Sequence, residues 1–98
     1  MDLPEAREKI NLLFDFYAAL LTQRQREIFT MYYFDDCSLA EIAKSVDISP
    51  QAVADMLHRT TKKLQHYEKL LGLAQKFEHQ NRTLEEIKIL LEKLEISV

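Results

Sequence analysis

Residues 38–64 carry the pattern of two short amphipathic helices joined by a polar turn, and this segment limits the possible folds more than any other. Ser38 and Glu41 have the spacing of a capping box, in which each side chain bonds an amide at the start of a helix. Ser49 is placed to cap a second helix, and Pro50 follows at the first helical position, where its missing amide costs nothing. Apolar side chains recur at helical spacing in both halves: Leu39, Ile42, Ala43 and Val46, then Val53, Leu57, Thr60 and Leu64. The segment therefore predicts a helix-turn-helix, a motif whose second helix enters the major groove when it binds DNA.

The composition predicts that helices fill the rest of the chain as well. The 98 residues include one Gly and two Pro, too few for disorder or for a turn-rich β architecture. We expect an all-α fold, a compact helical domain over residues 1–98 with a central helix-turn-helix at 38–64. The second helix of that motif is expected to continue beyond it as a long recognition helix. Residues 73–98 are expected to add a C-terminal helical extension.

Two apolar stripes mark the first helix, which we expect over residues 4–21. One stripe suits a core, whereas two need more than one packing partner. The second stripe meets either the chain's own core or a second copy of the chain, so a homodimer is one expectation. The stripes are Ile10, Leu13, Phe14, Tyr17 and Leu21, and Leu12, Phe16 and Leu20.

Capping signals predict the remaining boundaries. Thr22 and Gln25 form a capping box that opens a helix to about Tyr33. The long helix from Pro50 is expected to reach Leu71, with Leu57, Leu64 and Leu71 repeating every seven residues as a seam for another helix. Gly72 is then a C-cap or break. Thr83 and Glu86 form a third capping box, which predicts a separate last helix over 84–95.

The outward face of the second motif helix holds the candidate contacts to nucleic acid. Gln51 can pair with adenine, and Asp55 can accept from cytosine, although Asp55 also repels phosphate and can pair with Arg59 at i, i+4. Basic side chains farther along can contact phosphates, or they can simply form a solvated helix face. The six predicted nucleic-acid contacts are Gln51, Asp55, His58, Arg59, Lys62 and Lys63.

Charge is distributed unevenly along the chain, whose formal net charge is −3. Residues 1–36 carry seven acids and four bases, whereas residues 50–71 carry four bases and two acids. A net acidic chain lacks general attraction for phosphate, so any contact with nucleic acid belongs to the long helix.

The segment LTQRQREIFTMYYFDDCSLAEIAKSVDISPQAVADMLHRTTKKL resembles region 4 of bacterial sigma factors, which binds the −35 promoter element. Together with NLLFDFYAALLT before it and YEKLLGL after it, the chain resembles the YlxM family of small bacterial helix-turn-helix regulators over residues 10–73. This resemblance implies an all-helical fold, a cytoplasmic location and a link with the signal recognition particle pathway. YlxM-like chains typically carry arginine where this chain has Pro50 and tyrosine where it has Ala54.

Two functions therefore stay open from the sequence. The first is a nucleic-acid-binding regulator, with DNA or RNA as partner. The second is a protein-interaction module that kept the fold and binds components of the signal recognition particle pathway through its acidic half and apolar strips.

Catalysis, cofactors and membrane insertion are not expected. His58, His66 and His79 lack a metal-ligand spacing, and no nucleophile elbow or glycine-rich phosphate loop occurs. Cys37 is alone, which fits a reducing compartment and a packing role. The sequence also lacks a long apolar run or a signal peptide.

Overall fold

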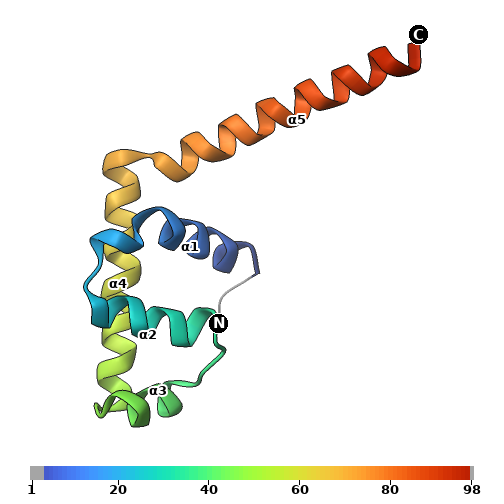
Figure 1. Ribbon diagram of the computed structural model, residues 1–98. Helices are drawn as coiled ribbons and strands as arrows, with labels where there is room; N and C mark the ends of the chain where they lie inside the picture. Colours follow the sequence, from blue (N-terminus) through green and yellow to red (C-terminus); the bar gives the residue numbers. More distant parts are fainter. Residues whose placement is uncertain (1–3, 98) are drawn as a thin grey trace.

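The computed structural model describes residues 4–97 as helices joined by short connections, which confirms the all-α fold. In Figure 1 the first three α-helices stack side by side along the fourth, and the fifth leaves the end of the fourth and projects away from the others. The elements are α1 (Pro4–Tyr17), the 3₁₀ turn η1 (Ala18–Leu20), α2 (Gln23–Tyr33), α3 (Leu39–Val46), α4 (Pro50–Leu71) and α5 (Leu73–Ser97).

Three of the predicted helix starts are confirmed by their side-chain caps. Thr22 and Ser38 each form a full capping box, with Gln25 and Glu41 as the reciprocal partners. The Ser49 Oγ accepts the Ala52 amide at 3.1 Å, with Pro50 in the first turn of α4. These bonds satisfy amides that have no partner inside their helices, which explains why each helix begins where it does.

Two buried clusters form the core, and α4 contributes to both. The upper cluster joins Leu13, Tyr17 and Phe29 to Leu64 of α4, and the lower one joins Ile42 to Val53 and their neighbours. Because one straight helix crosses both clusters, it fixes α1, α2 and α3 relative to one another.

Both apolar stripes of α1 are used within the chain. Leu12 and Phe16 are half-buried against the same cluster as Leu13, and of the second stripe only Leu20 is exposed. The helix is also shorter than predicted, because η1 takes the chain out of the α-helix after Tyr17. A second copy is thus not needed to cover α1.

A hydrogen-bonded elbow joins α4 to α5 around Gly72, which has a φ of 63° that suits glycine. The Glu68 carboxylate accepts the amides of Ala74 and Gln75, each at 3.0 Å, and so caps α5 from the preceding helix. The Tyr17 hydroxyl donates to Glu68 Oε1 at 2.6 Å and accepts the Leu73 amide at 3.1 Å. The elbow thereby ties α5 to both α1 and α4.

The prediction of a separate last helix over 84–95 is wrong, because α5 runs unbroken from Leu73 to Ser97. Thr83 lies inside this helix, where its hydroxyl donates to the His79 carbonyl at 3.1 Å instead of capping. A Thr-x-x-Glu pattern starts a helix only where the chain is not already helical, and no Gly or Pro interrupts residues 73–97.

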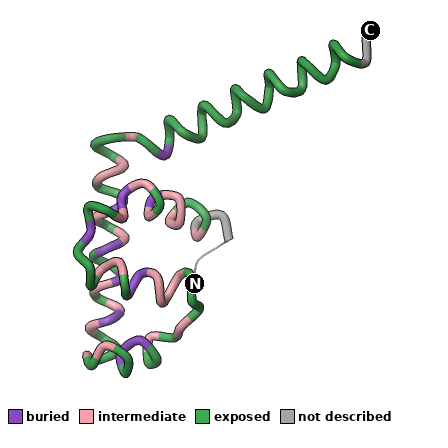
Figure 2. Tube along the Cα trace, in the orientation of Figure 1, coloured by how far each residue is buried: buried purple, intermediate pink, exposed green. Residues whose placement is uncertain are grey.

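The expected compact shape is correct for the body and wrong for α5. Residues 75–95 are all exposed, as Figure 2 shows for the projecting arm. The molecule extends 64 Å along its longest axis and 27 and 21 Å along the others. The heptad seam predicted on α4 is only partly used. Leu57 and Leu64 are buried, whereas Leu71 is 56 % exposed.

Candidate nucleic-acid interface

The six predicted contact residues lie on one side of α4, away from the core. With 3.6 residues per turn, the six residues share an arc about 140° wide, opposite the buried residues of α4. Five of them are exposed and Lys63, at the edge of the arc, is half-buried. The buried face holds Val53, Leu57, Thr60 and Leu64.

The helix-turn-helix geometry fixes where this side of α4 points. Asp47 ends α3 in the left-handed conformation with a φ of 57°, and the Ile48 amide donates to the Ala43 carbonyl at 3.1 Å. Ile42 and Val53, both fully buried, hold the two helices together. The start of α4 is therefore a rigid platform for the side chains that it carries.

A hydrogen bond ties together two of the predicted contacts. Gln51 Nε2 donates to Asp55 Oδ1 at 3.3 Å. The partner that the structure gives Asp55 is therefore Gln51, four residues before it, whereas the sequence had suggested Arg59, four residues after it. An amide that reads a base must first leave Asp55, so this side of α4 carries a built-in competitor for Gln51.

Two further side chains extend the contact surface beyond the six that the sequence singled out. His66 and Lys69 lie seven and ten positions after Arg59, on the same arc, and both are exposed. Helical periodicity was the signal that could have placed both in the contact set. With Lys62 between Arg59 and His66, the surface is basic along its C-terminal half. We define the outer face of α4 as Gln51, Asp55, His58, Arg59, Lys62, Lys63, His66 and Lys69.

A hollow of ≈ 320 Å³ opens beside the outer face where α2, α3 and α4 meet. His58 borders it from α4, and Tyr32 and Tyr33 border it from α2. Tyr32 and Tyr33 are half-buried and pack against the lower core cluster. Ala54 forms part of the wall, where a larger residue would fill the hollow.

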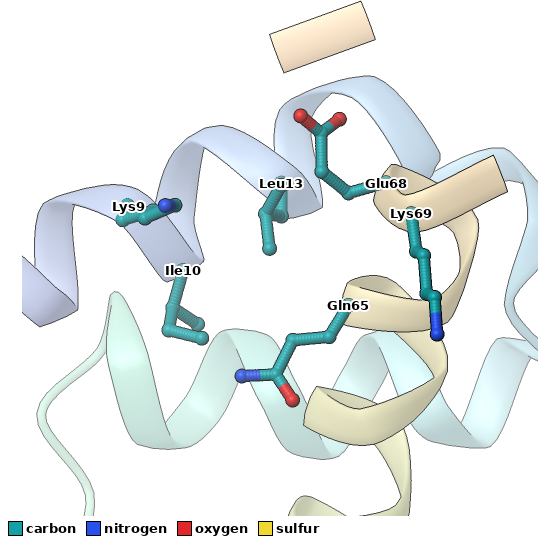
Figure 3. Close-up of a pocket in the computed structure, with 6 residues that line it drawn as sticks. All are labelled: Lys9, Ile10, Leu13, Gln65, Glu68 and Lys69. Atoms are coloured by element: carbon teal, nitrogen blue, oxygen red, sulfur yellow. The ribbon is translucent and has the colours of Figure 1, made fainter. Parts of the chain in front are cut away.

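A second cleft, of ≈ 420 Å³, lies between α1 and the C-terminal half of α4 (Figure 3). Lys9, Ile10 and Leu13 line it from α1, and Gln65, Glu68 and Lys69 from α4. Burial raises the pKa of Glu68, but the hydrogen bonds from Tyr17 and from the Ala74 and Gln75 amides outweigh burial, and the net pKa lies below its usual value. This carboxylate is an ionised structural cap and not a proton donor at neutral pH.

Cys37 lies among carboxylates that disfavour its ionised form. Desolvation raises the pKa of the Cys37 thiol, and the nearby carboxylates of Glu41, Asp35 and Asp36 raise it further, so the thiolate is disfavoured. Across residues 4–97, no group of three or more His, Cys, Asp or Glu side chains is placed to hold a metal ion. Within the same range no helix is both long enough and apolar enough to span a membrane.

Comparisons with known proteins agree with this architecture. Residues 4–97 match the model of the UPF0122 family, described as "Putative helix-turn-helix protein, YlxM / p13 like". A UPF0122 protein of Bacillus mycoides is 47 % identical over 91 residues, covering 93 % of this chain and 83 % of the relative. UPF0122 proteins of Bacillus cereus and Bacillus anthracis are each 46 % identical over the same length and coverage.

Proposed function

Because the chain belongs to the YlxM/p13-like family of helix-turn-helix proteins, we propose that it binds nucleic acid through the outer face of α4. The observation that carries this proposal is the exposure of Gln51, His58, Arg59 and Lys62 on the second helix of a capped helix-turn-helix. Within residues 4–97 no other element covers these side chains, so a duplex can reach them without rearrangement of the core.

The residues of the outer face divide into two roles. Arg59, Lys62 and Lys63 contact phosphates, which position the protein without reading sequence. Gln51 at the start of α4 reads a base edge, adenine being its natural partner, while Asp55 accepts from cytosine or holds Gln51 back. The docking mode follows region 4 of sigma factors, with the start of α4 in the major groove.

A salt titration tests the proposal most directly. Fluorescence anisotropy with a duplex DNA and with a structured RNA, over a range of salt, measures the number of phosphates contacted. Three contacts predict a slope of log K against log salt of about −2.7 on duplex DNA. Absence of binding to either probe at low salt would refute the proposal.

Matched variants separate the two roles. Lys62→Ala should weaken binding to all sequences alike and reduce the slope by about one. Gln51→Ala should instead change the preference among sequences. Arg82→Ala removes one positive charge from α5, away from the outer face, and should leave both properties unchanged. A Lys62→Ala variant no weaker than the Arg82→Ala control means that α4 has been assigned the wrong role.

A protein partner is the second candidate, and the Gln51–Asp55 hydrogen bond favours it because the base-reading amide is already engaged. In this case the acidic first half of the chain and its apolar strips bind components of the signal recognition particle pathway. Pull-down with the protein and the RNA of that particle, before and after charge reversal at Asp15 and Glu27, tests it. If the charge-reversed variant retains either component as well as the unaltered chain does, this surface is not the binding site.

We further propose that the protein is a non-catalytic component of the cytoplasm. The disfavoured thiolate of Cys37 and the family's helix-turn-helix character support a binding role in preference to catalysis. Fractionation of cells that produce the tagged chain tests the location.

A further inference from the structure

An unpartnered apolar seam runs along the arm formed by α5. From residue 77 onward, positions 77, 80, 84, 87, 91 and 94 alternate by three and four, the spacing of a heptad repeat. All of these are apolar except Gln80, and Leu90 flanks the seam on one side. Phe77 packs edge-on against Phe16 with ring centroids 5.5 Å apart, so the body covers only the first turns of the seam.

The exposed part of the seam forms one contiguous apolar surface on α5. Its side chains are between 47 % and 63 % exposed: Leu84, Ile87, Leu90, Leu91 and Leu94. Leucine-sized side chains exposed to this degree leave about 100 Å² each to water, or roughly 500 Å² of contiguous apolar surface per chain. A patch of this size is at the upper end of what a soluble monomer exposes, and such patches are often functional. Most helical stability in proteins comes from the packing of an amphipathic face, and residues 78–95 have no such packing within the described part of the chain.

We propose that the seam pairs with the seam of a second copy of this chain, as a two-helix coiled coil. Two such seams would bury about 1,000 Å² of apolar area, and homodimer interfaces are about 65 % apolar, which gives roughly 1,500 Å² in total. That is the standard size of a stable protein interface. A two-fold pairing needs only that the seam complement itself, and a stripe of Leu and Ile side chains does so.

Sedimentation of the full chain between about 1 and 100 µM tests the pairing. We expect a dimer that Leu84→Glu together with Leu91→Glu converts to a monomer. Ile89→Glu is the matched control, because Ile89 is 45 % exposed on the same helix but lies outside the seam. Near-UV circular dichroism of the aromatic core should be unchanged in all variants, since none of these residues contributes to the core. Hydrogen exchange in residues 78–95 should slow as the concentration of the unaltered chain rises.

A monomer at the highest concentration, a dimer that survives the seam variant, or a dimer lost equally in Ile89→Glu overturns the pairing. None of the variants alters the outer face of α4, so failure here is distinguishable from failure to bind nucleic acid.

Discussion

Replacing Tyr17 with phenylalanine removes one hydroxyl from the elbow between α4 and α5 and leaves the ring in place. Tyr17 is 1 % exposed, and its hydroxyl donates to Glu68 at 2.6 Å while it accepts the Leu73 amide at 3.1 Å. The ring contacts with Phe16 and Tyr67 do not involve the hydroxyl. The substitution therefore isolates the polar contribution of the elbow from its packing.

The expected loss follows from the charge of the acceptor. A hydrogen bond to an ionised group contributes about 1.5–3 kcal/mol, and Leu73 is exposed enough for water to replace the lost partner of its amide. We expect the free energy of unfolding to fall by about 2 kcal/mol, which lowers the Tm of a domain of this size by roughly 8–16 °C. Urea unfolding followed by circular dichroism measures the change. Tyr67→Phe is the matched control, because Tyr67 lies in the same cluster but its hydroxyl makes no hydrogen bond to the described part of the chain.

The pH dependence provides an independent check. The pKa of Glu68 is net lowered in the folded protein, so its contribution is present above the unfolded value of about 4.3 and is lost as the pH falls through the folded pKa. Phenylalanine at position 17 removes one of the bonds that lower this pKa. The difference in stability between Tyr17→Phe and the unaltered chain should thus be largest near neutral pH and narrow below about pH 4. A loss no greater than that of Tyr67→Phe, or a difference that stays constant into acid, would refute the reasoning.

Three further substitutions have defined outcomes. The Thr60 hydroxyl is buried without a partner among the described residues, so Thr60→Val should raise the free energy of unfolding by about 1 kcal/mol in urea titrations, and destabilisation would show that the hydroxyl is satisfied. Asp55→Asn keeps an acceptor for Gln51 but removes the negative charge from the outer face, so affinity for duplex DNA should rise several-fold in anisotropy titrations; unchanged affinity would place the DNA elsewhere. Ser49→Ala removes the cap that accepts the Ala52 amide and should cost about 1 kcal/mol in thermal unfolding, whereas an unchanged Tm would mean that water replaces the cap fully.

Local hydrogen bonds explain why most helix starts could be predicted from the sequence. The caps at Thr22, Ser38 and Ser49 each join groups three residues apart, so a short stretch of sequence contains both partners of each hydrogen bond. The start of α5 is different, because its cap Glu68 lies in the preceding helix and is itself held by Tyr17, which is 51 positions away. No local pattern contains that information.

Thr83 shows the opposite failure, in which a local pattern is present but is not used. Its capping box would require the chain to leave the helix beforehand, and the elbow at Gly72 had already started a helix that nothing interrupts. The same limit applies to the outer face of α4. The apolar period of α4 predicted which of its side chains are exposed. It could not predict the partner of Asp55, because Gln51 and Arg59 both lie four residues away and only the structure shows the hydrogen bond from Gln51.

The elbow also connects the two proposals, because it sets the angle between the outer face of α4 and the dimer seam of α5. In the proposed dimer, a rigid elbow holds the two outer faces at a fixed separation, so a long nucleic acid that reaches both binds the second at high effective concentration. Loosening the elbow with Tyr17→Phe should then weaken binding to a long duplex more than binding to a short one that reaches a single α4. Anisotropy with both lengths at equal salt measures the ratio, with Tyr67→Phe as the control. Equal weakening on both lengths would mean that the two faces act independently and that the elbow serves stability alone.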